Sequence, residues 1–139
     1  MDFLRKVQQM LERDEGRRAI PYVDTEGHLT VGIGHNLDEP LHPLLIDAIF
    51  QHDLHRHLDE LLTRWPFVEF FDEARKAALF NMAFQLGTPR LGSFRKMWAA
   101  LEARDWKEAR ACALDSKWAK QTPERAQRVA NQLWLGEWT

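Results

Sequence analysis

Two carboxylates near the N-terminus, Glu15 and Asp24, are the residues whose types and spacing could do chemistry. Hydrolysis of a glycosidic bond requires one acid that protonates the leaving oxygen and one charged carboxylate that serves the attacking water. Acidic residues at this separation are also common as solvated surface charges. Spacing alone leaves both interpretations open, so the elements that hold the two residues decide between them.

Glu15 is predicted to end a helix. Apolar residues recur at helical spacing from Phe3 to Leu11, which predicts an amphipathic helix over residues 2–15 with Gly16 as its stop. The negative end of the helix dipole then disfavours the ionised form of Glu15. A protonated Glu15 would suit the role of an acid.

Asp24 is predicted to lie in the turn of a β-hairpin, because β-branched and aromatic residues flank the turn sequence Asp24-Thr25-Glu26-Gly27. A polar turn keeps its carboxylate ionised. Small residues alternate with large apolar ones in the second strand: Thr30, Gly32 and Gly34 against Leu29, Val31 and Ile33. A strand face with so little side chain either lets a ligand approach the backbone or marks bends and bulges.

The rest of the chain is predicted to be helical. Periodic apolar residues indicate a long helix over residues 43–65 and a central buried helix over 72–86 that Gly87 closes. Ser93, Asp105 and the pair Thr122-Pro123 mark three further helix starts, and Gly136 ends the last helix.

The fold class is therefore α+β and predominantly α-helical, with a small N-terminal β-hairpin lobe packed on a helical body and a cleft between them. We expect a single domain over residues 1–139. Residues from about 16 to 42 form the small β lobe, and residues 1–15 and 43–139 form the helical body.

Composition describes a folded protein rather than a disordered one, with 45% hydrophobic and 29% charged residues. Cys112 is the single cysteine, which excludes an intramolecular disulfide and predicts a reduced packing residue. No export signal or membrane-spanning run is expected, so we predict folding in the cytoplasm. Residues 87–139 carry 10 Lys/Arg against 6 Asp/Glu, a basic half that could steer the protein to an anionic polymer.

Motifs along almost the whole chain resemble, in order, those of the phage-type lysozyme family. They are DEG followed by YVDTEGHLTVGIGH, then ARKAALFNMAFQLG, SF, DWKEA, KWAKQTPERAQRV and the closing Gly136-Glu137-Trp138. The resemblance implies a lysozyme-like fold. It also implies a muramidase that hydrolyses the β-1,4 bond between N-acetylmuramic acid and N-acetylglucosamine in peptidoglycan, with inversion at the anomeric carbon.

The same resemblance implies roles for three residues of the hairpin region. Glu15 resembles the general acid, Asp24 the second carboxylate that serves the attacking water, and Thr30 the threonine that helps to hold this water. Inversion requires the two carboxyl groups to lie ~6.5–9.5 Å apart, which leaves room for the water.

Further residues resemble those that line or support the family's cleft. Phe84 and Gln85 resemble substrate-binding residues, although plain core packing remains an alternative for Phe84. Gly34 is assigned to substrate binding with them because it lies on the bare face of the predicted strand. Arg125 resembles an arginine that pairs with Glu15, and such a pair would oppose the effect of the helix end; a surface arginine is the alternative.

Two other pairs complete the predicted site. Lys117 is expected to face Glu26 across the mouth of the cleft, and His35 and Asp53 resemble a structural ion pair. We expect no metal, because the remaining histidines show no ligand-like arrangement, and no cofactor.

The chain departs from the family pattern between His35 and Asp53, where it is shorter than the best-known member. This predicts a small lobe that is shortened or rebuilt at the outer saccharide subsites. Asn36, Met97 and Cys112 replace family residues that contact saccharide, so we assign them no binding role.

The expected partner is the glycan strand of bacterial peptidoglycan, with no nucleic acid and no membrane insertion. The resemblance implies a monomeric endolysin that stays in the host cytoplasm until a holin allows its release to the periplasm and cell wall. One alternative is a lytic transglycosylase that cleaves the same bond; another is a lysozyme-fold module that binds glycan without turnover. The presence of Asp24 and Thr30 argues against the transglycosylase, and the presence of Glu15 together with them argues against a module without turnover.

Overall fold

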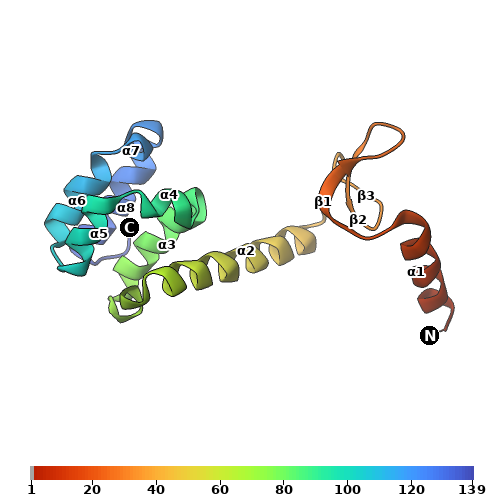
Figure 1. The fold of residues 1–139 in the computed structure, drawn as a ribbon, viewed down its shortest axis with the longest axis horizontal. Helices are drawn as coiled ribbons and strands as arrows, with labels where there is room; N and C mark the ends of the chain where they lie inside the picture. Colours follow the sequence, from red (N-terminus) through yellow and green to blue (C-terminus); the bar gives the residue numbers. More distant parts are fainter. Residues whose placement is uncertain (1) are drawn as a thin grey trace. The chain divides into compact units, whose positions relative to one another are not determined.

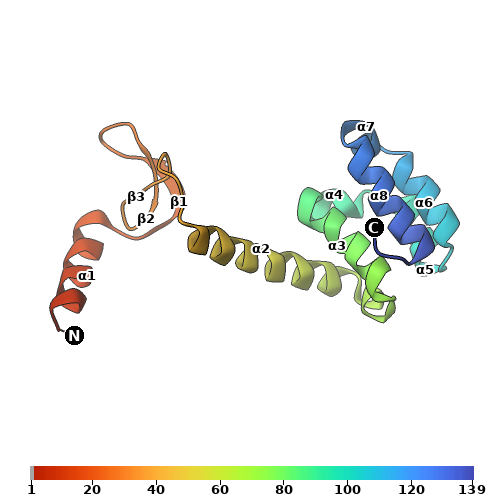
Figure 2. The same ribbon diagram turned by 180° about the vertical axis from the view of Figure 1, so that it is seen from behind.

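The computed structural model describes residues 2–139, which form two compact units (Figures 1 and 2). One unit ends at Ala48 and the other begins at Ile49, so that the boundary falls within helix α2 (Pro43–Arg64). Among residues 2–139, no helix combines the length and the apolar character needed to cross a membrane.

The N-terminal unit begins with helix α1 (Asp2–Glu15), which has the predicted bounds. Gly16 ends this helix with a φ of 76°, and its N–H donates to the carbonyl oxygen of Glu12 at 2.9 Å. The left-handed backbone of Gly16 stops the helix directly after Glu15. Glu15 therefore lies in the last turn, as its spacing predicts.

An antiparallel sheet follows α1, with the strand order β1-β2-β3 (Figure 1). Strands β1 (Arg18–Val23) and β2 (Leu29–Gly32) form the predicted hairpin, and Val23 lies opposite Leu29. The second strand ends two residues earlier than predicted. Gly32 and Gly34 take φ values of 69° and 67°, a conformation that favours glycine, and they turn the chain into β3 (His35–Asn36), a short strand the sequence did not predict.

The C-terminal unit contains the rest of α2 and a series of further helices. Three of these match predicted helices: α3 (Glu73–Leu86), α6 (Trp106–Leu114) and α8 (Pro123–Leu135). Gly87 and Gly136 follow α3 and α8 with φ values of 78° and 68°, as predicted for helix stops. Three shorter elements were not predicted: the 3-10 helix η1 (Pro66–Phe70), α4 (Thr88–Gly92) and α7 (Lys117–Gln121).

The predicted helix start at Ser93 is wrong. Helix α5 (Arg95–Glu102) begins two residues later, and its first turn receives no hydrogen bond from a side-chain cap. Ser93 instead uses its hydroxyl to donate to the carbonyl oxygen of Arg90, at the end of α4. The serine therefore finishes one short helix rather than starting the next. By contrast, Asp105 caps α6 as predicted and accepts from the N–H of Glu108 at 3.1 Å.

The core lies in the C-terminal unit. Helix α8 packs against α3, α6 and α7, and α5 packs against α6. The largest fully buried side chains are Leu61, Val68, Leu79, Met82, Leu91, Met97, Leu101 and Leu133. Helix α3 buries Ala74, Ala78, Leu79, Met82 and Ala83. Asn81 is the one exposed residue after its first turn, in agreement with the prediction that this part of the helix is apolar on nearly all sides. The α+β, predominantly helical fold class is confirmed.

Candidate functional site

Glu15 and Gly34 meet within the N-terminal unit. A Cβ atom placed on Gly34 would lie 2.9 Å from Oε2 of Glu15 and 3.1 Å from its carboxyl carbon. The absence of a side chain at Gly34 is therefore what gives the Glu15 carboxyl group its room. The predicted small-residue face of the hairpin region thus adjoins the predicted acid.

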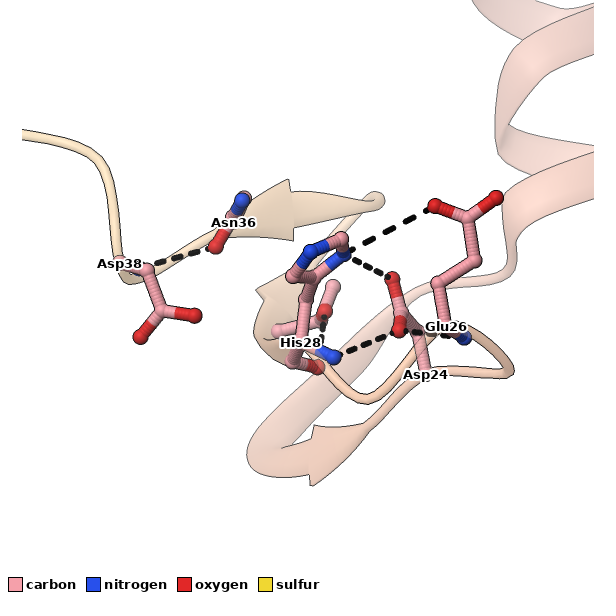
Figure 3. A network of polar contacts seen from close by, with 6 residues as sticks. Asp24, Glu26, His28, Asn36 and Asp38 are labelled. Carbon is pink, nitrogen blue, oxygen red and sulfur yellow. Dashed lines mark hydrogen bonds and ion pairs between the residues drawn. The ribbon is translucent and has the colours of Figure 1, made fainter.

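Asp24 is held by the backbone of its own turn (Figure 3). Its Oδ1 atom accepts from the N–H of His28 at 2.8 Å and from the N–H of Glu26 at 2.9 Å. These hydrogen bonds favour the charged carboxylate. The N–H of His28 above all, with that of Glu26, holds the pKa of Asp24 below its usual range, in agreement with the predicted ionised state.

The other oxygen of Asp24 faces an imidazole ring. His28 Nδ1 lies 3.4 Å from Oδ2 of Asp24 and 3.9 Å from Oε2 of Glu26 (Figure 3). Sequence reasoning missed His28 as a neighbour of the predicted catalytic carboxylate. The signal was present in the turn sequence. A tight hairpin turn brings its first and last residues together, and His28, which follows Gly27, therefore lies beside Asp24.

Thr30 is the one residue of β2 that is buried, with 3% of its surface exposed. Its hydroxyl donates to the carbonyl oxygen of His28 at 2.9 Å. Thr30 is thereby attached to the same turn that holds Asp24. Its predicted role in holding a water remains a prediction.

Gln85 and Phe84 lie at the end of α3 in the C-terminal unit. Oε1 of Gln85 accepts from the indole N–H of Trp118 at 2.8 Å, a contact between α3 and α7. Phe84 is half-buried and packs beside His57 and Phe50, with ring centroids 5.1 Å and 6.0 Å away. Both interpretations of Phe84, substrate contact and packing, agree with this partial exposure.

A pocket of about 770 Å³ opens beside Trp118. Its wall includes the predicted support residue Lys117 together with Met97 and Cys112, to which the sequence assigned no binding role. Burial, and then the nearby Glu108 carboxylate, raise the pKa of the Cys112 thiol. Cys112 is therefore a neutral part of the pocket wall.

Arg125 hydrogen-bonds to α3 within its own unit. Its Nε donates to Oδ1 of Asn81 at 2.9 Å. Glu15 has no cation at ion-pair distance among residues 2–48. Because Arg125 and Glu15 belong to different units, their pairing remains a prediction, as does the pairing of Lys117 with Glu26.

His35 and Asp53 also belong to different units, so their ion pair remains a prediction. Nε2 of His35 is buried and has no hydrogen-bond partner within residues 2–48, while Oδ1 of Asp53 lies 3.3 Å from Nδ1 of His52. Among residues 2–139, no three histidine, cysteine or acidic side chains gather as ligands of a metal ion would.

Comparison with known proteins places this chain in a family. The family model described as "Phage lysozyme" matches residues 12–132. "Probable T4-type lysozyme 1" of Dictyostelium discoideum is 28% identical over 94% of both chains. The "Pre-baseplate central spike protein Gp5" of Enterobacteria phage T4 is 32% identical over 92% of this chain and 27% of its own length. "Peptidoglycan hydrolase gp36" of Pseudomonas phage phiKMV is 31% identical over 88% of this chain and 14% of its own length.

The helical fold, its small antiparallel sheet and these matches define a glycoside hydrolase of the lysozyme class. The family match covers most of the sequence and includes Glu15, Asp24 and Thr30. The chain belongs to the phage lysozyme family.

Proposed function

We propose that the protein is a peptidoglycan hydrolase that cleaves the β-1,4 bond between N-acetylmuramic acid and N-acetylglucosamine with inversion. One observation carries this proposal: a single small unit holds a carboxyl group against the bare Gly34 and a second carboxylate that its own turn keeps charged. The relatives named as lysozymes and as a peptidoglycan hydrolase support the choice of substrate.

In the proposed reaction, Glu15 gives its proton to the glycosidic oxygen as the bond from this oxygen to the anomeric carbon breaks. A water molecule attacks the same carbon from the opposite face and loses its proton to Asp24. The charged carboxylate also stabilises the positive charge that develops on the sugar. Thr30 orients the water, and Gly34 keeps space for the sugar beside Glu15.

The C-terminal unit contributes the glycan-binding residues in this proposal. Phe84 and Gln85 line the saccharide site, and Arg125 supports Glu15. The indole of Trp118 supports the assignment of Gln85, because their hydrogen bond fixes the amide oxygen and leaves the amide N–H groups as donors.

For its biological setting, we propose a monomeric endolysin that remains in the host cytoplasm until a holin permits its release to the cell wall. The basic residues of the C-terminal half would favour binding to an anionic wall. Clearing of intact walls should then weaken as salt is added, because salt screens exposed charges. Clearing that is independent of salt would contradict the electrostatic part of this proposal.

The decisive experiment compares hydrolysis of purified peptidoglycan by the wild type, Glu15→Gln and Asp24→Asn. We expect Glu15→Gln to lower the rate by roughly 10²–10⁴-fold, the usual contribution of a general acid. Asp14→Asn is the matched control, since Asp14 is the neighbouring acid on α1 and already pairs with Arg13 at 2.8 Å. Full activity in Glu15→Gln would refute the assignment of the acid.

Product analysis separates the alternatives. Mass spectrometry of the released muropeptides should find reducing ends that carry the added water. Ends in the 1,6-anhydro form would indicate a lytic transglycosylase instead, and binding to peptidoglycan without release of fragments would indicate a module that has no turnover.

A further inference from the structure

His28 lies beside the carboxylate that the proposed function makes the partner of the attacking water. Its Nδ1 atom is 3.4 Å from Oδ2 of Asp24, within the unit that also holds Glu15 (Figure 3). The inference drawn from this contact rests on the proposed function, because it concerns what His28 does to Asp24.

The two oxygens of Asp24 have different surroundings. Oδ1 accepts two backbone hydrogen bonds, from the N–H groups of Glu26 and His28, and is committed to the turn. Oδ2 is the oxygen left to accept a proton from water, and it is also the oxygen that His28 Nδ1 approaches. The imidazole and the attacking water therefore compete for one atom.

The side chain of His28 is 44% exposed, so it exchanges protons freely with solvent. The other acidic group beside it is Glu26, whose Oε2 lies 3.9 Å from Nδ1 and whose side chain is 80% exposed. Four other titratable residues lie on the same sheet or just after it. Arg18 and Tyr22 belong to β1, where the Arg18 guanidinium lies 4.4 Å from the centre of the Tyr22 ring; His35 begins β3, and Asp38 follows β3. Among residues 2–48, none of these four hydrogen-bonds to His28 or forms an ion pair with it, so the acidic groups that face the imidazole are Asp24 and Glu26.

We propose that His28 is a positioning residue whose protonation restrains Asp24. The charged imidazole has a proton on Nδ1 in every case, and donates it to Oδ2. This bond holds the carboxylate against the turn and takes the oxygen that would receive the proton of the attacking water. Neutral His28 has a weaker hold on Oδ2, so the carboxylate is free to act as a base at neutral pH and above.

The first test is a pH–rate profile of His28→Gln against the wild type. The substitution keeps the backbone N–H that donates to Oδ1, so it removes the imidazole without removing the anchor of Asp24. From about pH 8 down to about pH 5, we expect the rate of the wild type relative to the variant to fall by roughly two- to fivefold, the effect of a partly exposed ion pair. His55→Gln, a matched change at an exposed histidine of α2, should keep a constant ratio to the wild type.

A ratio of wild type to His28→Gln that stays constant, or that rises as the pH falls, would overturn the proposal. These outcomes count against His28 only if Glu15→Gln and Asp24→Asn are inactive in the same assay. If either of those variants keeps full activity, the proposed function itself fails, and the two failures are thereby distinguished.

A second measurement needs no substrate. The NMR titration of the His28 ring in the full chain should move to lower pH in Asp24→Asn, because the loss of a facing negative charge makes protonation less favourable. The amide of asparagine preserves an acceptor for the turn, so the hairpin is retained. An unchanged titration in Asp24→Asn would show that the imidazole and the carboxylate are not coupled, and the proposal would be wrong.

Discussion

The N-terminal unit and the C-terminal unit are stabilised by different means. Among residues 2–48, Thr30 alone is buried, and the unit is organised by turns and by hydrogen bonds such as those to Asp24. The C-terminal unit instead encloses a large apolar cluster built around α3 and α8. The proposed acid and base are thus positioned by turns and backbone hydrogen bonds, whereas the proposed glycan-binding residues are positioned by a packed apolar core.

This difference can be measured, because the two units carry different chromophores. All six tryptophans lie between Trp65 and Trp138, in the C-terminal unit, and the single tyrosine is Tyr22 in β1. Tryptophan fluorescence therefore reports unfolding of one unit and tyrosine fluorescence that of the other.

The largest effect is expected for Leu79→Ala in the core of the C-terminal unit. Leu79 on α3 is completely buried, and removal of its side chain leaves a cavity, so we expect a loss of about 2–5 kcal/mol in the free energy of unfolding. Urea unfolding followed by tryptophan fluorescence measures the loss. Leu135→Ala is the matched control at a side chain that is 50% exposed, and a loss of similar size there would contradict the comparison.

Gly34→Ala should damage the site while sparing the core. The new methyl group would push on the Glu15 carboxyl, and a displacement of about 1 Å costs roughly 100-fold in rate. Gly32→Ala provides the control, since Gly32 has nearly the same φ but nothing within 4 Å of a Cβ. Both variants place a side chain at a positive φ, so both should lose a similar amount of stability in unfolding followed by tyrosine fluorescence. Equal hydrolysis rates in the two variants would refute the contact with Glu15.

Arg75→Met tests how the end of α8 is held in the C-terminal unit. Arg75 donates to the carbonyl oxygens of Leu133 and Trp134 at 2.8 and 2.6 Å and lies over the Trp106 ring at 4.3 Å. Methionine keeps the apolar stem but removes the donors, so we expect a loss of about 2 kcal/mol. Thermal unfolding monitored by tryptophan measures it, and the exposed Lys107→Met should leave stability unchanged.

The smallest effect concerns acid stability of the hairpin. Because the pKa of Asp24 is lower in the folded state than in the unfolded chain, its charge stabilises the fold at neutral pH. This contribution is lost as the pH falls through the folded pKa. Asp24→Asn accepts the same N–H groups without titrating, so its hairpin should show a flatter acid dependence in amide hydrogen exchange. Parallel curves for the two proteins would contradict the link to Asp24.

The sequence predicted the parts of the fold that local rules determine. Helix α1, the hairpin turn and the glycine stops at Gly87 and Gly136 follow from periodicity and backbone preference. Elements of five residues, such as α4 and α7, are too short to show a period, so they were not predicted. The prediction at Ser93 was wrong because a serine hydroxyl can donate to the last carbonyl groups of one helix as readily as it can cap the start of the next.

The candidate site was predictable to a similar extent. The position of Glu15 at a helix end and of Asp24 in a turn came from spacing, and the bare Gly34 came from strand alternation. The contact between His28 and Asp24 was missed, although closure of the hairpin turn between these two residues could have indicated it. Likewise, Met97 and Cys112 share a pocket wall only because α5 packs on α6.

The double hydrogen bond to Oδ1 of Asp24 makes the length of the hairpin loop matter more than its composition. Its two donors are backbone N–H groups at fixed steps along the loop, and any residue except proline supplies one. A library that randomises Thr25 therefore leaves the Asp24 carboxylate where it is. A library that inserts or deletes one residue between Asp24 and β2 moves these donors away from Oδ1. We therefore expect loop grafting at this position to succeed only between hairpins of equal length.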